Sequence, residues 1–288
     1  MAVRVDESLA RGFRNSFLRY VEAEQERVFN RVGECIRHHD HGPHLPRKQA
    51  KGYMRQLDVA AESPLVLHRR TLEARRLSRW WYVQPYISRD YPVNNWQENV
   101  LTLEYTIVLP LQQVIWTDTK KFHFTVSTHA IQRIFQRISW PELPTEKSII
   151  PELAELVLYA PAWWSALLSC EATAESNEEP FRYLAFIPTQ HGAFLGNFDE
   201  PMLDLRTFIC TEQMTQKQLS LWKDARQIHA SFDPILRLDE NILLLVSMSR
   251  FELDDKYLKI VEEANGLIHD LCARHSDLLM PERMKDYF

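Results

Sequence analysis

The chain has few glycines, and it lacks the motifs that mark several common enzyme classes. Only seven of its 288 residues are glycine, and neither GxxxxGKS/T nor GxGxxG occurs. A P-loop and a Rossmann dinucleotide site are therefore not expected. The G-x-S-x-G pattern is missing too, so a serine hydrolase with that nucleophile elbow has no support. A low glycine content instead fits a helix-rich chain.

Long apolar runs and paired cysteines are also missing from the sequence. No stretch approaches the ~20 apolar residues of a membrane-spanning helix, and the opening MAVRVDESLARGF is too charged for a secretory signal. The cysteines are widely scattered and form no CxxC pair: Cys35, Cys170, Cys210 and Cys272. We therefore expect a cytoplasmic protein with free thiols and no membrane partner. The net charge of −5 means that any nucleic-acid binding requires a local basic patch.

Apolar periodicity predicts helices towards both ends of the chain and strands between them. Helices are expected over residues 8–32, 48–61, 151–169 and 254–275. Alternating segments rich in β-branched and aromatic residues predict strands in LTLEYTIVLPLQQVIW, KFHFTVS, FRYLAFIP, GAFLGNF and DLRTFICT. The predicted class is α+β, a small antiparallel sheet domain with one amphipathic helix, flanked by N- and C-terminal helices. The predicted domains are a helical region (1–84), a central α+β region (98–232) and a second helical region (233–288).

A basic segment, HRRTLEARRLSR, occupies residues 68–79 and is followed at once by Trp80, Trp81 and Tyr82. One hypothesis is a surface for RNA on which bases stack against the rings. Its arginines are the candidate nucleic-acid contacts: Arg69, Arg70, Arg75, Arg76 and Arg79. The other interpretation is a solvated helix face that ends in core aromatic residues, with Ser63 and Pro64 placed to begin that helix.

A cluster of possible metal ligands follows the first predicted helix: Cys35, His38, His39, His41 and His44. Zinc accepts cysteine and histidine ligands, but the spacing matches no established zinc pattern. The end of a helix followed by a loop explains the cluster equally well. We therefore predict neither a metal nor another cofactor.

The most specific segment is TVSTHAIQRIFQRI, residues 125–138, which is predicted to pass from a strand into a short amphipathic helix. At ~100° per residue, its isoleucines and Phe135 share one side of the helix. The opposite side carries an imidazole beside two guanidiniums, on His129, Arg133 and Arg137. Such a set suits phosphate chemistry, since arginine grips phosphate through two parallel hydrogen bonds.

This segment contains the pattern S-x-H-A-x-x-R-x-x-x-R, from Ser127 to Arg137. With the later strands and the turn TQHGAFLG, it resembles the superfamily of metal-independent ribonucleases and toxins that includes barnase, EndoU, colicin nuclease domains and RelE. The resemblance covers roughly Leu101 to Arg226. It implies a toxin-like ribonuclease domain, from a bacterium or a phage, that cuts RNA without a metal.

Residue roles follow from the chemistry of such cleavage. A base must remove the 2′-hydroxyl proton, an acid must protonate the leaving oxygen, and fixed cations must hold the charge. His129 is the predicted base, since Ser127 as a cap would place it near a helix N-terminus. Arg133 and Arg137 are the predicted phosphate ligands, and His191, in a turn between strands, is the provisional acid.

The alternative is a protein that performs no chemistry. It would be an adaptor or regulator of a bacterial or phage system, binding a protein partner through its helical flanks or binding nucleic acid without cutting it. His129 would then bond a neighbouring strand, and Arg133 and Arg137 would pair with surface carboxylates. An enzyme should turn over RNA in EDTA, whereas an adaptor should co-purify with a partner.

Overall fold

A computed structural model describes residues 3–39, 47–72, 79–88, 100–110, 115–174, 183–199, 202–231 and 255–279. The chain forms two compact units. The N-terminal unit comprises Asn15–Phe122 and Thr145–Ile150, and the C-terminal unit comprises Met1–Arg14, His123–Pro144 and Pro151–Phe288. The predicted α+β class with helices towards both ends is confirmed. The division into domains 1–84, 98–232 and 233–288 stays a prediction.

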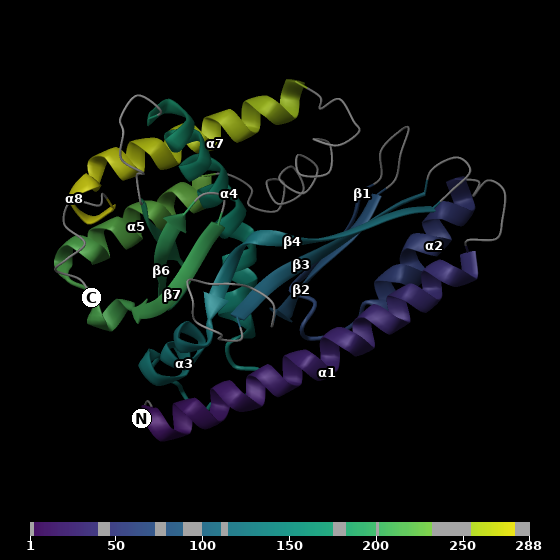
Figure 1. The fold of residues 1–288 in the computed structure, drawn as a ribbon, viewed down its shortest axis with the longest axis horizontal. Coiled ribbons are helices and arrows are strands. Elements are labelled where there is room, and N and C mark those ends of the chain that lie inside the picture. The colour runs from purple at the N-terminus through teal and green to yellow at the C-terminus, as the bar shows by residue number, and fades with distance from the viewer. Residues whose placement is uncertain are drawn as a thin grey trace. The chain divides into compact units, whose positions relative to one another are not determined.

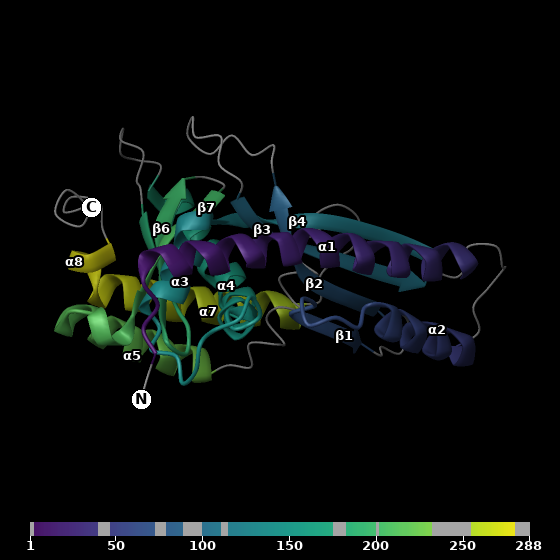
Figure 2. The same cartoon turned by 90° about the horizontal axis from the view of Figure 1, so that it is seen from below.

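The N-terminal unit combines two helices with a strand ladder. Its elements are most of α1 (Glu7–His39), then α2 (Arg47–Ala60), β1 (His68–Leu72), β2 (Arg79–Ser88), β3 (Val100–Pro110) and the first part of β4 (Ile115–Ser127). The strands lie in the order β1-β2-β3-β4, and both β1/β2 and β2/β3 are antiparallel. Helices α1 and α2 pack against β2 and β3 through one buried cluster that includes Val28, Leu57 and Trp80 (Figure 2).

The predicted arginine-rich helix over residues 68–79 is wrong where the structure describes it. His68–Leu72 forms a strand, in which Arg69 lies opposite Tyr82. Strand β2 continues past Tyr82 to Ser88. Leucine and arginine favour a helix locally, but pairing with the aromatic strand outweighs that propensity. Trp80 and Tyr82 are buried in the core, so they offer no stacking surface for bases.

The C-terminal unit contains a second ladder, in the order β4-β7-β6-β5 (Figure 1). Its elements are the start of α1, the end of β4, α3 (Thr128–Arg137), α4 (Ile150–Ala174), β5 (Tyr183–Pro188), β6 (Gly192–Asp199), β7 (Met202–Cys210), the 3-10 turn η1 (Thr211–Gln213), α5 (Gln216–Ser231), α7 (Asp255–Arg274) and α8 (Ser276–Leu279). The β5/β6 and β6/β7 pairs are antiparallel, whereas β4 and β7 are parallel. Between β4 and β7 the chain passes through α3, α4, β5 and β6, and β7 then pairs in parallel with β4. The sheet is therefore mixed.

Helices cover the sheet of this unit from two directions. Helix α3 lies against β7, and its Phe135 stacks on Phe13 with ring centroids 5.5 Å apart. Helices α5 and α8 contact β5, and α7 contacts both of these helices; Figure 1 shows the three helices together. Between β6 and β7 the register shifts at Gly196, where the carbonyl of Asp204 comes so close that no larger residue fits. Among the described helices, none combines the length and the apolar character that a membrane crossing needs.

Candidate functional site

The amphipathic helix predicted from the sequence is α3, and its first turn is fixed by Ser127. Ser127 is the N-cap, with φ −66° and ψ 152°, and its Oγ accepts a hydrogen bond of 3.0 Å from the Ala130 amide. The same hydroxyl donates to the carbonyl of Arg206 on β7 over 2.8 Å. Ile134 and Phe135 are buried, which leaves His129 and its arginine neighbours on the opposite side of the helix. The predicted cap and the predicted faces are both confirmed.

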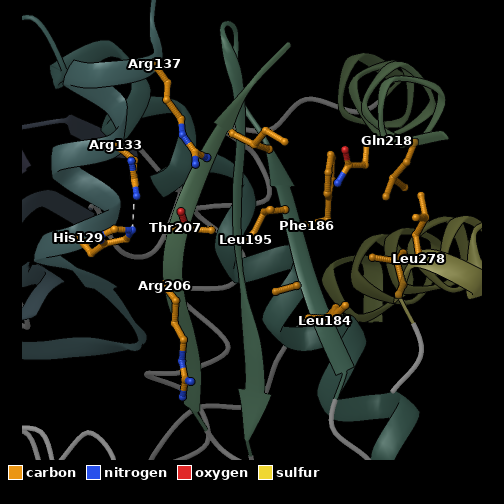
Figure 3. A pocket seen from close by; sticks show the side chains of 14 residues that line it. His129, Arg133, Arg137, Leu184, Phe186, Leu195, Arg206, Thr207, Gln218 and Leu278 are labelled. Carbon is orange, nitrogen blue, oxygen red and sulfur yellow. Dashed lines mark hydrogen bonds between the residues drawn. The ribbon is translucent and has the colours of Figure 1, made fainter. Parts of the chain in front are cut away.

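Those three side chains of α3 line a single cavity of about 610 Å³. Strands β5, β6 and β7 contribute further lining residues, among them Phe186, Leu195 and Thr207. Figure 3 shows His129, Arg133 and Arg137 on one side of these strands and residues of α5 and α8 on the other. The volume lies within the range of about 300–1,000 Å³ that is typical of small-molecule sites.

The α3 end of the cavity is rich in positive charge. Arg133 Nε donates to His129 Nε2 over 3.0 Å, and Arg133 Nη1 donates to Gln136 Oε1 over 2.6 Å (Figure 3). Arg137 donates to the backbone carbonyl of Phe208. A guanidinium only donates hydrogen bonds, so His129 Nε2 is an unprotonated acceptor in this geometry. His129 is exposed, and the contact with Arg133 leaves it on the cavity side of the helix.

Neither Arg133 nor Arg137 forms an ion pair with any residue that the structure describes. Burial lowers the pKa of Arg137, and the neighbouring charge of Arg133 lowers it further. Both effects oppose the charged form, yet arginine remains protonated near neutral pH. Since no described carboxylate pairs with these two adjacent guanidiniums, their charges favour the binding of an external anion.

Arg206 also lines the cavity, but its charge is compensated. Its Nε donates to Asp204 Oδ2 over 2.8 Å, while the Thr125 hydroxyl donates to Asp204 Oδ1 over 3.0 Å. Asp204 is buried, so these bonds hold its carboxylate beside the guanidinium. The uncompensated positive charge of the described lining therefore belongs to α3.

The end of the cavity near α5 and α8 is mostly apolar. Leu184 and Phe186 come from β5, Leu221 from α5, and Leu278 and Leu279 from α8. Gln218 on α5 is the one amide side chain among the described lining residues. The cavity thus joins a cationic end to an apolar end.

His191, the predicted acid, does not line this cavity. It lies in the turn between β5 and β6, as predicted, and its Nδ1 is 2.5 Å from Oε1 of Glu152 on α4. The hydrogen bond with Glu152 raises the pKa of His191, and the charges of Glu152 and Glu155 add to the rise against the opposing effect of burial. The structure therefore brings together three of the four predicted catalytic residues.

The other two sequence-derived candidates lie largely outside the described residues. Within the basic segment, Arg69 is exposed and donates to the carbonyl of Asp58 over 2.9 Å. The structure describes only the backbones of Arg70 and Arg79 and nothing of Arg75 and Arg76.

In the histidine cluster, only the Cys35 side chain is described. It is a half-buried free thiol whose pKa is raised by burial. The side chains of the four histidines lie outside the described part: His38, His39, His41 and His44. Within that part, no group of three or more histidine, cysteine or acidic residues is placed to hold a metal.

Several cavity residues carry no recognisable motif in the sequence. Arg206 lines the cavity and stands two residues after Asp204 on one strand, a spacing that places both on one face and can signal an ion pair. Gln218 stands three residues after Thr215, which suggests a helix cap and nothing about a ligand. Leu278 and Leu279 join the cavity only through the path of the chain after α7.

An imidazole acceptor beside two guanidiniums that pair with no described carboxylate can bind a phosphate and can take a proton from a group next to it. Among the three, only His129 lies in the first turn of α3, where the helix dipole attracts an anion, whereas Arg137 is in the last turn. Comparisons of this chain with protein-family models, with curated proteins and with solved structures find no match.

Proposed function

We propose that this protein cleaves RNA without a metal at the cavity lined by α3. The observation that carries the proposal is the convergence of His129, Arg133 and Arg137 on one cavity, where both guanidiniums lack a carboxylate partner among the described residues. Phosphodiester cleavage requires a base and fixed positive charge, and these three side chains supply both.

The hydrogen bond between Arg133 and His129 suggests how substrate would activate the base. In the free protein, Arg133 Nε–H occupies the lone pair of His129 Nε2. A phosphate oxygen carries negative charge and is a stronger acceptor than a neutral imidazole. Binding of the phosphate would turn Arg133 towards the anion, and Nε2 would be released to accept a proton.

The proposed reaction then needs no further titratable residue. His129 Nε2 takes the proton of the 2′-hydroxyl, the 2′-oxygen bonds to phosphorus, and the bond from phosphorus to the 5′-oxygen breaks. In-line displacement places that leaving oxygen on the side of phosphorus opposite His129, so water protonates it and the imidazolium releases its proton to solvent, giving a 2′,3′-cyclic phosphate and a 5′-hydroxyl. Arg133 and Arg137 hold the non-bridging oxygens, whose charge grows in the transition state. His191 has no part in this mechanism, since its ring is bonded to Glu152.

The test is cleavage of end-labelled single-stranded RNA in excess EDTA. The wild-type protein should produce fragments that end in a cyclic phosphate, and His129→Ala should lose at least ~10²-fold in rate. His191→Gln is the matched histidine control and should cut at a rate close to that of the wild type.

Three results would count against the proposal. Undiminished cleavage by His129→Ala would remove the proposed base, and cleavage that stops in EDTA would point to a metal. RNA that is bound and never cut would favour the alternative, a nucleic-acid-binding adaptor or regulator.

A further inference from the structure

The cavity has an apolar end that the binding of a phosphate alone does not require. A phosphate needs the guanidiniums of α3, whereas Leu221 and Leu279 on the far side offer it no hydrogen bond. Leu184 and Leu195, which line the same cavity, are partly exposed, so apolar surface faces the open space of the cavity. An apolar wall of this kind is stabilised when an apolar group of the ligand displaces water from it. The ligand should therefore join an anion to an apolar body.

The dimensions of the sheet set the length of that ligand. The cationic end lies against β7 and the apolar end against β5, with β6 between them. Neighbouring strands are ~4.8 Å apart, so the two ends are separated by roughly 10 Å. This separation matches the reach of one nucleotide from its phosphate to the outer edge of its base.

Gln218 gives the apolar end one polar group of defined character. Its side-chain Oε1 accepts a hydrogen bond of 2.9 Å from the backbone N–H of Thr215, and the backbone N–H of Gln218 donates to Thr215 Oγ1 over 3.3 Å. A backbone N–H must meet an acceptor, so this cap assigns the oxygen of the side-chain amide. The NH2 group is then what Gln218 offers to the cavity (Figure 3). A donor at that point suits the acceptors on a base edge, whereas an aliphatic chain would leave it unpaired.

We infer that the cavity takes one unpaired nucleotide, with its phosphate on Arg133 and Arg137 and its base in the apolar end beside Phe186 and Gln218. The phosphate contacts rest on the proposed function, and the base site goes beyond it. A base enclosed in the apolar end of the cavity cannot at the same time pair with another strand. The substrate at this site is therefore single-stranded, with one base turned out of its stack.

Calorimetric titration of the full chain with three phosphates tests the base site without requiring cleavage. Uridine 3′-monophosphate carries a base, ribose 5-phosphate lacks one, and octyl phosphate replaces the base by an aliphatic chain. Burial of one base against apolar side chains should make the nucleotide bind about tenfold or more tightly than the sugar phosphate. Gln218→Glu keeps the cap acceptor and removes the donor, so it should reduce this ratio several-fold. Gln213→Glu, an exposed glutamine in η1 outside the cavity lining, is the matched charge control and should leave the ratio unchanged.

The outcomes separate the base site from the cleavage reaction. A ratio near one between nucleotide and sugar phosphate, no binding of any probe, or tighter binding of octyl phosphate than of the nucleotide would each overturn the base site. Selective nucleotide binding by a protein that never cuts RNA would keep the base site and remove the cleavage proposal. RNA cleavage together with a ratio near one would keep the cleavage proposal and remove the base site.

Discussion

The pair formed by His191 and Glu152 allows a prediction whose size follows from burial. The Glu152 side chain is 2% exposed, its Oε1 lies 2.5 Å from His191 Nδ1, and its Oε2 has no hydrogen-bond partner among the described residues. His191→Ala would leave a buried carboxylate with neither oxygen bonded. Breaking a fully buried pair costs about 3–5 kcal/mol. Because the imidazole is 46% exposed and water can enter its place, we expect a smaller loss of about 1–3 kcal/mol.

The same pair makes stability depend on pH. The hydrogen bond with Glu152 raises the pKa of His191 above its ordinary value of 6.5, so the folded state holds the proton more tightly than the unfolded state. This contribution is fully present below the unfolded pKa and is lost as the pH rises through the folded pKa. The cost of His191→Ala should therefore be larger at pH 6 than at pH 8.

Urea unfolding of the wild type, His191→Ala and His191→Gln at both pH values measures the effect. Glutamine can still donate to Glu152 but does not titrate, so His191→Gln should keep part of the stability and lose its pH dependence. A cost for His191→Ala below about 0.5 kcal/mol, or an equal cost at both pH values, would refute a structural role for this pair.

Two further substitutions test the local geometry that positions α3 and β7. Ser127→Ala removes both the helix cap and the hydrogen bond to β7. Thermal unfolding should show that the free energy of unfolding falls by about 1–2 kcal/mol. An unchanged stability would mean that the cap is dispensable. Gly196→Ala places a Cβ 2.0 Å from the carbonyl oxygen of Asp204 and should cost about 2 kcal/mol or more. Gly12→Ala in α1 is the control: its Cβ meets nothing within 4 Å, so it should raise stability by ~0.5–1 kcal/mol. Equal effects of Gly196→Ala and Gly12→Ala would contradict the close approach at Gly196.

The sequence predicts the parts of this protein that depend on short-range pattern. Helix α3, its cap at Ser127 and the turn at His191 each follow from a few neighbouring residues, and each lies where the pattern places it. The sequence does not predict strand β1, because its two arginines and Leu72 favour a helix until the aromatic strand β2 pairs with them. Local propensity cannot anticipate such a partner.

The cavity residues likewise fall into two groups: those that a local sequence pattern identifies, and those that only the folded chain brings together. His129, Arg133 and Arg137 are found together because they occupy one helix face. The sequence analysis predicts His191 as the acid beside them, but in the structure its partner is Glu152, 39 residues away on α4. The apolar wall from α8 depends on how the chain returns after α7, which no spacing in the sequence encodes.

The most direct test of the central claim is the affinity of the protein for an RNA dinucleotide that carries a 2′-deoxy group at the scissile position and cannot be cut. If Arg133 and Arg137 hold the phosphate, Arg133→Gln and Arg137→Gln should each weaken binding by about tenfold or more, since each removes a charge-assisted hydrogen bond. Arg11→Gln removes an exposed charge that is already paired with Glu7, and it should bind as the wild type does. Equal affinity in all four proteins would contradict the phosphate site on α3.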